Sequence, residues 1–346
     1  RGGKLSDATA QWGLADRTGW WNSITAADID GDGDLDLFAG NFGLNTKYHT
    51  SKEHPVTLFY GDMDGSGHDQ LVEAKYEGDN LLPVRGRSCS SAAMPVLKDR
   101  FKTFRSFAGS SLEQIYTPDR LKAASKFTVS ELASGILRND GGKFTFVPLP
   151  RQAQLAPVFG CAFLDADADG NMDLLLAENF WSPQLETGRM DGDLGQLLLG
   201  NGDGTFRVLP PDQSGILVPG DAKALVLADW NRDGAPDAIF TRNNDRAVAV
   251  EGTPAPNGNH RLTLRLTGPK NNPFAVGATV SVKTPDKTRR AALCGGGGYL
   301  SQSAPYLFMG LGKADRAAEV IVTWPGGRQS VLKDVPSGMV EVAFPK

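Results

Sequence analysis

The sequence predicts an all-β protein built from short strands and tight turns. Its 346 residues include 41 Gly and 21 Pro, the two residues that most often interrupt regular structure. Apolar runs are short and recur every few tens of residues, and no long stretch has helical periodicity. The hydrophobic content of 40% is enough for buried cores. We therefore expect several small sheets rather than a helical bundle.

An acidic pattern recurs four times between apolar runs. Written D-x-[DN]-x-[DNS]-G-x-x-[DQ], it occupies residues 28–36, 62–70, 165–173 and 229–237, here called the first to fourth acidic loops. Oxygen side chains at positions 1, 3, 5 and 9, a carbonyl at position 7 and a Gly at position 6 suit calcium before magnesium. A divalent ion would also offset the repulsion among the crowded carboxylates. The predicted metal ligands are Asp28, Asp30, Asp32, Asp34, Asp36, Asp62, Asp64, Ser66, Gln70, Asp165, Asp167, Asp169, Asn171, Asp173, Asp229, Asn231, Asp233, Ala235 and Asp237.

The acidic loops have two other interpretations. An EF-hand needs a bidentate Glu at position 12, where this sequence has Ala39, Leu176 and Phe240, and it needs helices where β-like apolar runs flank the loops. A metal-free Asp-Gly turn is the other alternative. The second loop departs from the pattern, because Gln70 replaces the last acid and Ser66 the acid at position 5. We expect three calcium sites and a weaker fourth in the second loop.

Two further segments predict hairpins. Residues 135–150 and 196–210 each place a tight Asn/Asp/Gly turn between an apolar strand and a strand that begins with Phe. Two strands joined by an acidic loop and followed by a hairpin make a four-stranded sheet, and such sheets repeated around an axis make a β-propeller. We therefore predict a calcium-binding β-propeller over residues 1–252. Only about four units are visible, the lower limit for a closed ring, so missing upstream blades or another chain would complete it.

A helical insertion is predicted at about residues 77–134. Leu97, Phe101, Phe104 and Ala108 follow helical spacing, which predicts an amphipathic helix over residues 93–107. Pro118 indicates the first turn of a second, short helix. We expect this insertion to interrupt the repeat of sheets.

A second domain is predicted after a Pro/Gly/Asn-rich linker at residues 253–260. Residues 261–346 alternate polar and apolar side chains in several runs, and two of these runs flank the turn PGG at residues 325–327. This pattern predicts a small β-sandwich-like domain.

The quoted motifs resemble those of known families. The acidic loops, the hairpins and the run GWWNSITAADIDGDGDLDLFAGNFGLNTKY are similar to FG-GAP or VCBS repeats, the propeller repeats of integrin α-subunits and of the cartilage acidic protein-like family. The resemblance implies calcium in the loops. The runs GGGGYLSQSAPYLFMGLG and VIVTWPGG resemble the ASPIC/UnbV domain that follows such propellers. Phe308 stands where a His is expected, which argues against a polar site at that position.

Composition and motifs exclude several function classes. The four loops hold 15 of the 40 acidic residues and the net charge is only −4, which disfavours nucleic-acid binding. No apolar run is long enough to span a membrane. Neither a G-x-S-x-G nor an H-E-x-x-H motif is present and the four His are scattered, so no enzyme is predicted.

The predicted function is an extracellular calcium-binding propeller that acts as a binding or adhesion module, with structural calcium in the inter-strand loops. The expected partner is a protein or carbohydrate ligand at the cell surface. The chain is expected to be secreted, cell-surface or periplasmic, and bacterial in type. The alternatives are a structural subunit of a larger surface assembly and the propeller part of a polysaccharide-acting enzyme.

Overall fold

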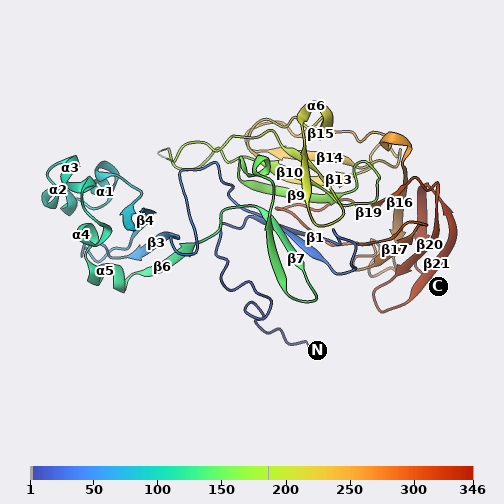
Figure 1. Ribbon diagram of the computed structural model, residues 1–346, viewed down its shortest axis with the longest axis horizontal. Helices are drawn as coiled ribbons and strands as arrows, with labels where there is room; N and C mark the ends of the chain where they lie inside the picture. Colours follow the sequence, from blue (N-terminus) through green and yellow to red (C-terminus); the bar gives the residue numbers. More distant parts are fainter. Residues whose placement is uncertain (1–2, 186, 346) are drawn as a thin grey trace. The chain divides into compact units, whose positions relative to one another are not determined.

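The computed structural model describes residues 3–185 and 187–345 and divides the chain into two compact units. One unit consists of Leu14–Trp20 and Thr46–Leu132 with the N-terminal residues as far as Ala10. The other consists of Gln11–Gly13, Trp21–Asn45 and the chain from Ala133 onward. Figure 1 shows the elements of both units along the chain. In the part of the chain that is described, no helix has the length and apolarity that a membrane span requires.

The first unit is a four-stranded antiparallel sheet with short helices. The sheet order is β5-β4-β3-β6, with strands β3 Val56–Gly61, β4 Gln70–Glu77, β5 Asn80–Pro83 and β6 Ser125–Val129. The helices are α1 Arg87–Ala93, α2 Val96–Arg100, α3 Phe104–Ala108, α4 Leu112–Tyr116 and α5 Pro118–Ala123. One core joins strand residues such as Phe59 and Val72 to helix residues such as Leu97 and Ile115. The second acidic loop connects β3 to β4.

The predicted single helix over residues 93–107 is wrong. Pro95 follows the end of α1, and α2 ends before Phe101. Thr103 then starts α3, because its side chain accepts the N–H of Ser106 in a reciprocal capping box. This break turns Phe104 to the surface, where it is 64% exposed. The short helix that begins at Pro118 is confirmed as α5.

Three small sheets hold the other acidic loops in the second unit. Their orders are β1-β2-β7-β8, β12-β11-β10-β9 and β13-β14-β15, and all strand pairs are antiparallel. The strands are β1 Ser23–Ala27, β2 Asp36–Gly40, β7 Gly135–Asn139, β8 Phe144–Pro148, β9 Val158–Leu164, β10 Asp173–Glu178, β11 Gln196–Gly200, β12 Phe206–Leu209, β13 Ala222–Ala228, β14 Asp237–Arg242 and β15 Val248–Val250. Short helical turns lie at η1 Arg151–Gln154 and α6 Pro211–Ser214. Both predicted hairpins are confirmed, as β7–β8 and β11–β12.

The three sheets pack on one another through two apolar cores. Phe38 and Ile136 of the first sheet share a core with Leu174 and Leu198 of the second. Leu175 on the opposite side of the second sheet belongs to another core, with β13 and β14 side chains of the third sheet. The predicted all-β class is therefore confirmed as a mostly β chain with several small sheets. Among the described residues these sheets form no closed ring, so the propeller stays a prediction.

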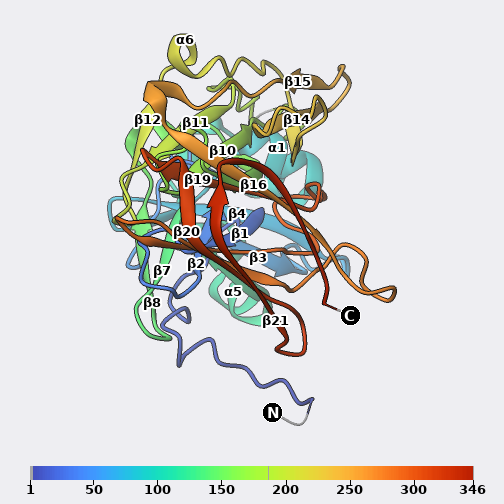
Figure 2. The ribbon, with the colours of Figure 1, turned by 90° about the vertical axis from the view of Figure 1, so that its right-hand side faces the viewer.

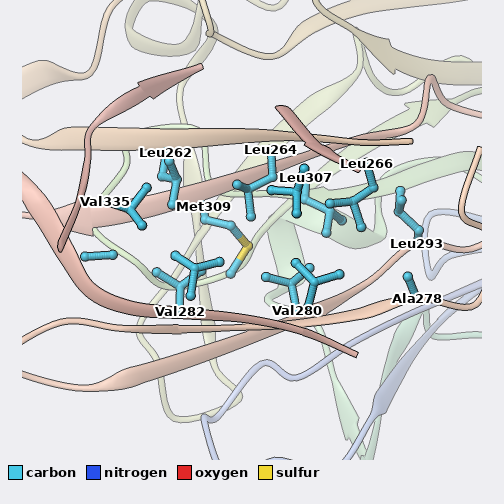
Figure 3. Close-up of a cluster of buried hydrophobic side chains, with 14 of the residues drawn as sticks. Leu262, Leu264, Leu266, Ala278, Val280, Val282, Leu293, Leu307, Met309 and Val335 are labelled. Atoms are coloured by element: carbon cyan, nitrogen blue, oxygen red, sulfur yellow. The ribbon is translucent and has the colours of Figure 1, made fainter. Parts of the chain in front are cut away.

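The C-terminal residues form two sheets around a core of their own. The sheet orders are β19-β16-β22 and β18-β17-β20-β21, with β16 and β22 parallel. The strands, some visible side by side in Figure 2, are β16 His260–Thr267, β17 Thr279–Lys283, β18 Thr288–Ala292, β19 Tyr306–Gly312, β20 Arg316–Thr323, β21 Gln329–Pro336 and β22 Gly338–Ala343. Figure 3 shows Leu264 and Met309 of one sheet facing Val280 and Val282 of the other. The residues before β16 include the turn η2 Pro256–Gly258.

Candidate metal centres

Each acidic loop connects two neighbouring antiparallel strands, and its ninth residue begins the second strand. The first loop lies between β1 and β2, the second between β3 and β4, the third between β9 and β10, and the fourth between β13 and β14. In every loop the ninth side chain accepts the backbone N–H of the second residue. These hydrogen bonds run from Ile29 to Asp36 at 3.1 Å, from Met63 to Gln70 at 2.7 Å, from Ala166 to Asp173 at 2.7 Å and from Trp230 to Asp237 at 3.0 Å. The four loops therefore share one backbone shape.

The ninth aspartate also ties three of the loops to a third segment. Its other oxygen accepts a backbone N–H from Asn139 at 2.8 Å in the first loop, Gly200 at 2.9 Å in the third and Gly252 at 2.8 Å in the fourth. Asp36, Asp173 and Asp237 are all buried. The sequence pattern predicts an oxygen at this position, but it does not predict this second anchor, because the donors lie 103, 27 and 15 residues away.

In the first, third and fourth loops, here called the complete loops, the first aspartate has one buried oxygen that accepts no hydrogen bond. Asp28 Oδ2, Asp165 Oδ1 and Asp229 Oδ1 are buried and have no hydrogen-bond partner. The other oxygen of each side chain accepts a loop N–H, from Gly31 at 2.9 Å, Gly170 at 2.9 Å and Gly234 at 3.1 Å. A buried carboxylate oxygen without a donor is costly unless a cation binds it. The donor set thus fits a hard divalent ion.

Two of the loops gather three carboxylates in one place. Ligand oxygens of Asp28, Asp30 and Asp36 lie within 4.8 Å of one another, and the same holds for Asp165, Asp167 and Asp173. Two buried acidic clusters could therefore hold a metal ion. In the fourth loop Asn231 takes the third position, so its oxygens come from two buried aspartates and an exposed amide. Asn231 Oδ1 accepts the N–H of Asp233 at 3.0 Å.

The remaining predicted ligands of the first, third and fourth loops are exposed or half-buried, apart from the buried Ala235. The fifth residue accepts the N–H of the seventh at 2.8 Å in the first loop, 2.7 Å in the third and 2.8 Å in the fourth, which closes a tight turn in each. These pairs are Asp32 with Asp34, Asp169 with Asn171, and Asp233 with Ala235. The side chain of the seventh residue makes no hydrogen bond within the turn in the first and fourth loops. The backbone carbonyl of the seventh residue is the group that the loop pattern assigns to the metal.

The second loop already contains protein donors at its oxygens. Gln70 Nε2 donates to Asp64 Oδ1 at 3.0 Å and to Ser66 Oγ at 3.3 Å. Arg120 Nη1 lies 3.6 Å from Asp62 Oδ1, and Asp62 Oδ2 accepts the N–H of Gly67 at 3.0 Å. The Gln70 amide thus donates hydrogen bonds to the oxygens of this loop, and the Arg120 guanidinium places a positive charge beside Asp62. The sequence pointed to Gln70, but it contained no signal for Arg120.

Burial raises the pKa of the acids in the third loop most. It raises the pKa of Asp165 to about 7 and that of Asp173 to about 8, and the neighbouring loop carboxylates add to both effects. Burial likewise raises the pKa of Asp36 in the first loop to about 6, against the two N–H groups that donate to it. These carboxylates are unfavourable as anions without a compensating charge.

Residues of the C-terminal sheets reach two of the loops, which the sequence did not predict. Lys287 Nζ donates to Asn171 Oδ1 at 2.6 Å, and Arg290 Nη1 lies 4.0 Å from Asp28 Oδ2. A cavity of about 420 Å³ lies between the first loop, the third loop and residues 287–290. The C-terminal residues thus form part of the surroundings of both acidic clusters.

Comparisons with known proteins agree with the C-terminal assignment. Residues 268–340 match the family described as ASPIC and UnbV. Over 159 residues, 41% of this chain and 24% of the relative, the sequence is 31% identical to cartilage acidic protein 1 of Homo sapiens. Over 141 residues, 37% of this chain and 22% of the relative, it is 30% identical to the Xenopus tropicalis protein of the same name. The chain thus spans about a quarter of the length of these curated relatives.

Among solved structures, the V. cholerae biofilm matrix protein Bap1 aligns with 86% of this chain and 62% of its own, at 11% identity and a TM-score of 0.18. The family match and the curated relatives concern the sequence itself. Together with the two sheets that residues 260–343 form, they lead to one assignment. Residues 268–340 match the ASPIC and UnbV family, so the C-terminal segment is called the ASPIC/UnbV domain below, and part of the chain is similar to cartilage acidic protein 1.

Proposed function

We propose that this chain is an extracellular calcium-binding module that acts in binding or adhesion, with calcium as a structural ion in three acidic loops. One observation carries the proposal. The first aspartate of the first, third and fourth loops has a buried oxygen without a partner, whereas in the second loop Asp62 has donors at both oxygens. The first, third and fourth loops are thus the ones in which the first aspartate keeps a buried oxygen without a hydrogen-bond donor.

Calcium is the ion that this donor set favours. The ligands are carboxylate, amide and backbone oxygens on a flexible loop, which suits the variable coordination of calcium better than the strict octahedron of magnesium. Affinities of roughly 10⁻⁴ to 10⁻³ M, typical of extracellular modules, are expected. When bound, the ion would neutralise the carboxylates and hold the two strands of each loop together.

The extracellular setting and the blade architecture belong to the same proposal. The curated relatives carry the name cartilage acidic protein 1, which supports an extracellular setting. Three sheets that pack on one another, each with an acidic loop between two of its strands, support a propeller of FG-GAP type, in which the three-stranded third sheet would be an incomplete blade. We assign the chain no catalytic step, and a protein or carbohydrate of the cell surface is the partner class that we propose.

Calcium titration of a variant series tests this proposal. Protein stripped with chelator should bind three calcium ions per chain by isothermal titration calorimetry. Asp28→Asn, Asp165→Asn and Asp229→Asn should each lose one ion, because each removes the charged oxygen that lacks a partner. Asp62→Asn is the matched control in the second loop and should keep three. Equal binding by all four variants and the unaltered chain would overturn the assignment of the sites.

A further inference from the structure

The third acidic loop is held from outside by the ASPIC/UnbV domain. Gly310 N–H of β19 donates to Asp165 Oδ2 at 2.9 Å, and Gly312 N–H donates to the carbonyl of Ala168 at 3.0 Å. Arg261 Nη2 of β16 donates to the carbonyls of Asp165 at 3.0 Å and of Ala166 at 2.8 Å. Two adjacent strands of the C-terminal sheet thus fix the backbone and the first ligand of this loop.

The bond from Gly310 decides which oxygen of Asp165 is left for a cation. Asp165 Oδ2 accepts both the Gly170 N–H, from within the loop, and the Gly310 N–H, each at 2.9 Å. Asp165 Oδ1 is buried and has no hydrogen-bond partner. One carboxylate oxygen of Asp165 also lies within 4.8 Å of a carboxylate oxygen of Asp167 and one of Asp173. In the fourth loop, by contrast, Asp229 Oδ2 accepts a single N–H, from Gly234. In the third loop a backbone N–H from a distant strand thus orients the first ligand.

Glycine is required at position 310 by space. A Cβ atom there would overlap Asp165 Oδ2 and would lie 2.6 Å from the backbone carbon of Ala168. The backbone of Gly310 is not in the left-handed region, so conformation alone does not require glycine. Any side chain must push the strand away from the loop.

Apolar packing joins the same strand to the blades. Phe308 of β19 is 8% exposed and belongs to the core that contains Leu225, Leu227 and Phe240 of the third sheet. This explains a Phe where a His was expected. The strand therefore docks through Phe308 and contacts the loop through Gly310, two residues further on.

We infer that the ASPIC/UnbV domain completes the third cation site, with Gly310 as its positioning residue, so that cation binding and domain docking strengthen each other. The inference rests on the proposed calcium function. Docking excludes water from Asp165, which is fully buried, and it holds the carboxylates close together. A bound cation would reduce the repulsion among these carboxylates further than Arg261 does, and such coupling is necessarily reciprocal.

Calcium titration of Gly310→Ala tests the first half of this inference. The variant should bind calcium at one site about tenfold more weakly than the unaltered chain, within the usual range of coupling between sites. Gly297→Ala is the matched control in the same domain, because the nearest atom that its Cβ would meet is 3.8 Å away. It should keep three sites of unchanged affinity. Three unchanged sites in Gly310→Ala would overturn the inference.

Amide hydrogen exchange tests the second half and does not depend on the folding of Gly310→Ala. Exchange over residues 306–312 of the unaltered chain should slow on calcium addition, because the Gly310 and Gly312 N–H groups contact the third loop. The slowing should persist in Asp28→Asn, which removes the first site, and should disappear in Asp165→Asn. Exchange that calcium leaves unchanged in the unaltered chain overturns the inference. Absence of calcium binding to the unaltered chain would instead defeat the proposed function itself.

Discussion

Glu178, at the end of β10, is a buried acid that none of the proposed sites uses. It is fully buried, and neither carboxylate oxygen has a hydrogen-bond partner. Burial raises the pKa of Glu178 well above its ordinary value, and the Asp193 carboxylate adds to the effect. The folded chain therefore holds this proton more tightly than the unfolded chain does. Its contribution to stability is present at acidic pH and is lost as the pH rises above about 4.3.

Replacing Glu178 by an apolar residue of similar length should stabilise the protein at alkaline pH. We expect Glu178→Met to raise the free energy of unfolding by about 1–3 kcal/mol near pH 8, and by less near pH 5, because it removes a buried carboxyl group without a hydrogen-bond partner that the unfolded chain ionises freely at the higher pH. Urea denaturation at the two pH values measures this difference. Glu113→Met, at an exposed position on α4, is the control and should follow the unaltered chain. A Glu178→Met variant that is less stable near pH 8 would contradict the prediction.

At the scale of single residues, the sequence predicted which side chains form the loops but not what completes them. Asp28, Asp165 and Asp229 were identifiable because the spacing of oxygens within nine residues is a local pattern. Arg120 beside Asp62 and Gly310 beside Asp165 were not, because the partners are 58 and 145 residues apart. Contacts across such separations are set by the fold and leave no periodicity in the chain.

The second acidic loop is an element in which protein donors take the place of the ion. We expect Gln70→Asp to add a fourth calcium site, because it removes the amide that donates to Asp64 and Ser66 and restores a carboxylate at position 9. Gln70→Asp combined with Arg120→Gln should bind this ion more tightly, since the guanidinium beside Asp62 repels a cation.

Calcium stoichiometry by calorimetry measures the effect of the Gln70 variants. Arg120→Gln alone serves as the control and should leave the stoichiometry of the three complete loops unchanged. If both Gln70 variants still bind three ions, the backbone of the second loop, and not its side chains, excludes calcium.

Strands next to a loop motif were predictable, whereas long-range pairings were not. The apolar runs around each acidic loop became β1–β2, β3–β4, β9–β10 and β13–β14, as their short length, their apolar character and the turn residues between them indicated. The hairpin β7–β8 pairs with β2, with Leu137 opposite Leu37. The segment Thr46–Leu132 of the first unit lies between these two strands in the sequence. Helical spacing over residues 93–107 failed because the capping residue Thr103 and Pro95 outweigh the apolar period locally.

On the scale of the whole molecule, composition and turn content were sufficient to predict a mostly β chain. The stacking of three sheets through two cores was not deducible from local pattern, since each core draws side chains from segments far apart in sequence. The contact between the ASPIC/UnbV domain and the third loop was not deducible either, because Gly310 and Asp165 are 145 residues apart.

The central claim is that calcium holds the loops of this protein, and thermal melting paired with elemental analysis tests it most directly. With three sites of roughly 10⁻³ to 10⁻⁴ M affinity, about 10 mM calcium should raise the melting temperature by on the order of 10 °C over chelator-treated protein. Three calcium ions per chain and this shift are the predicted result. Protein that contains no calcium and melts at the same temperature with calcium and with chelator would contradict the account.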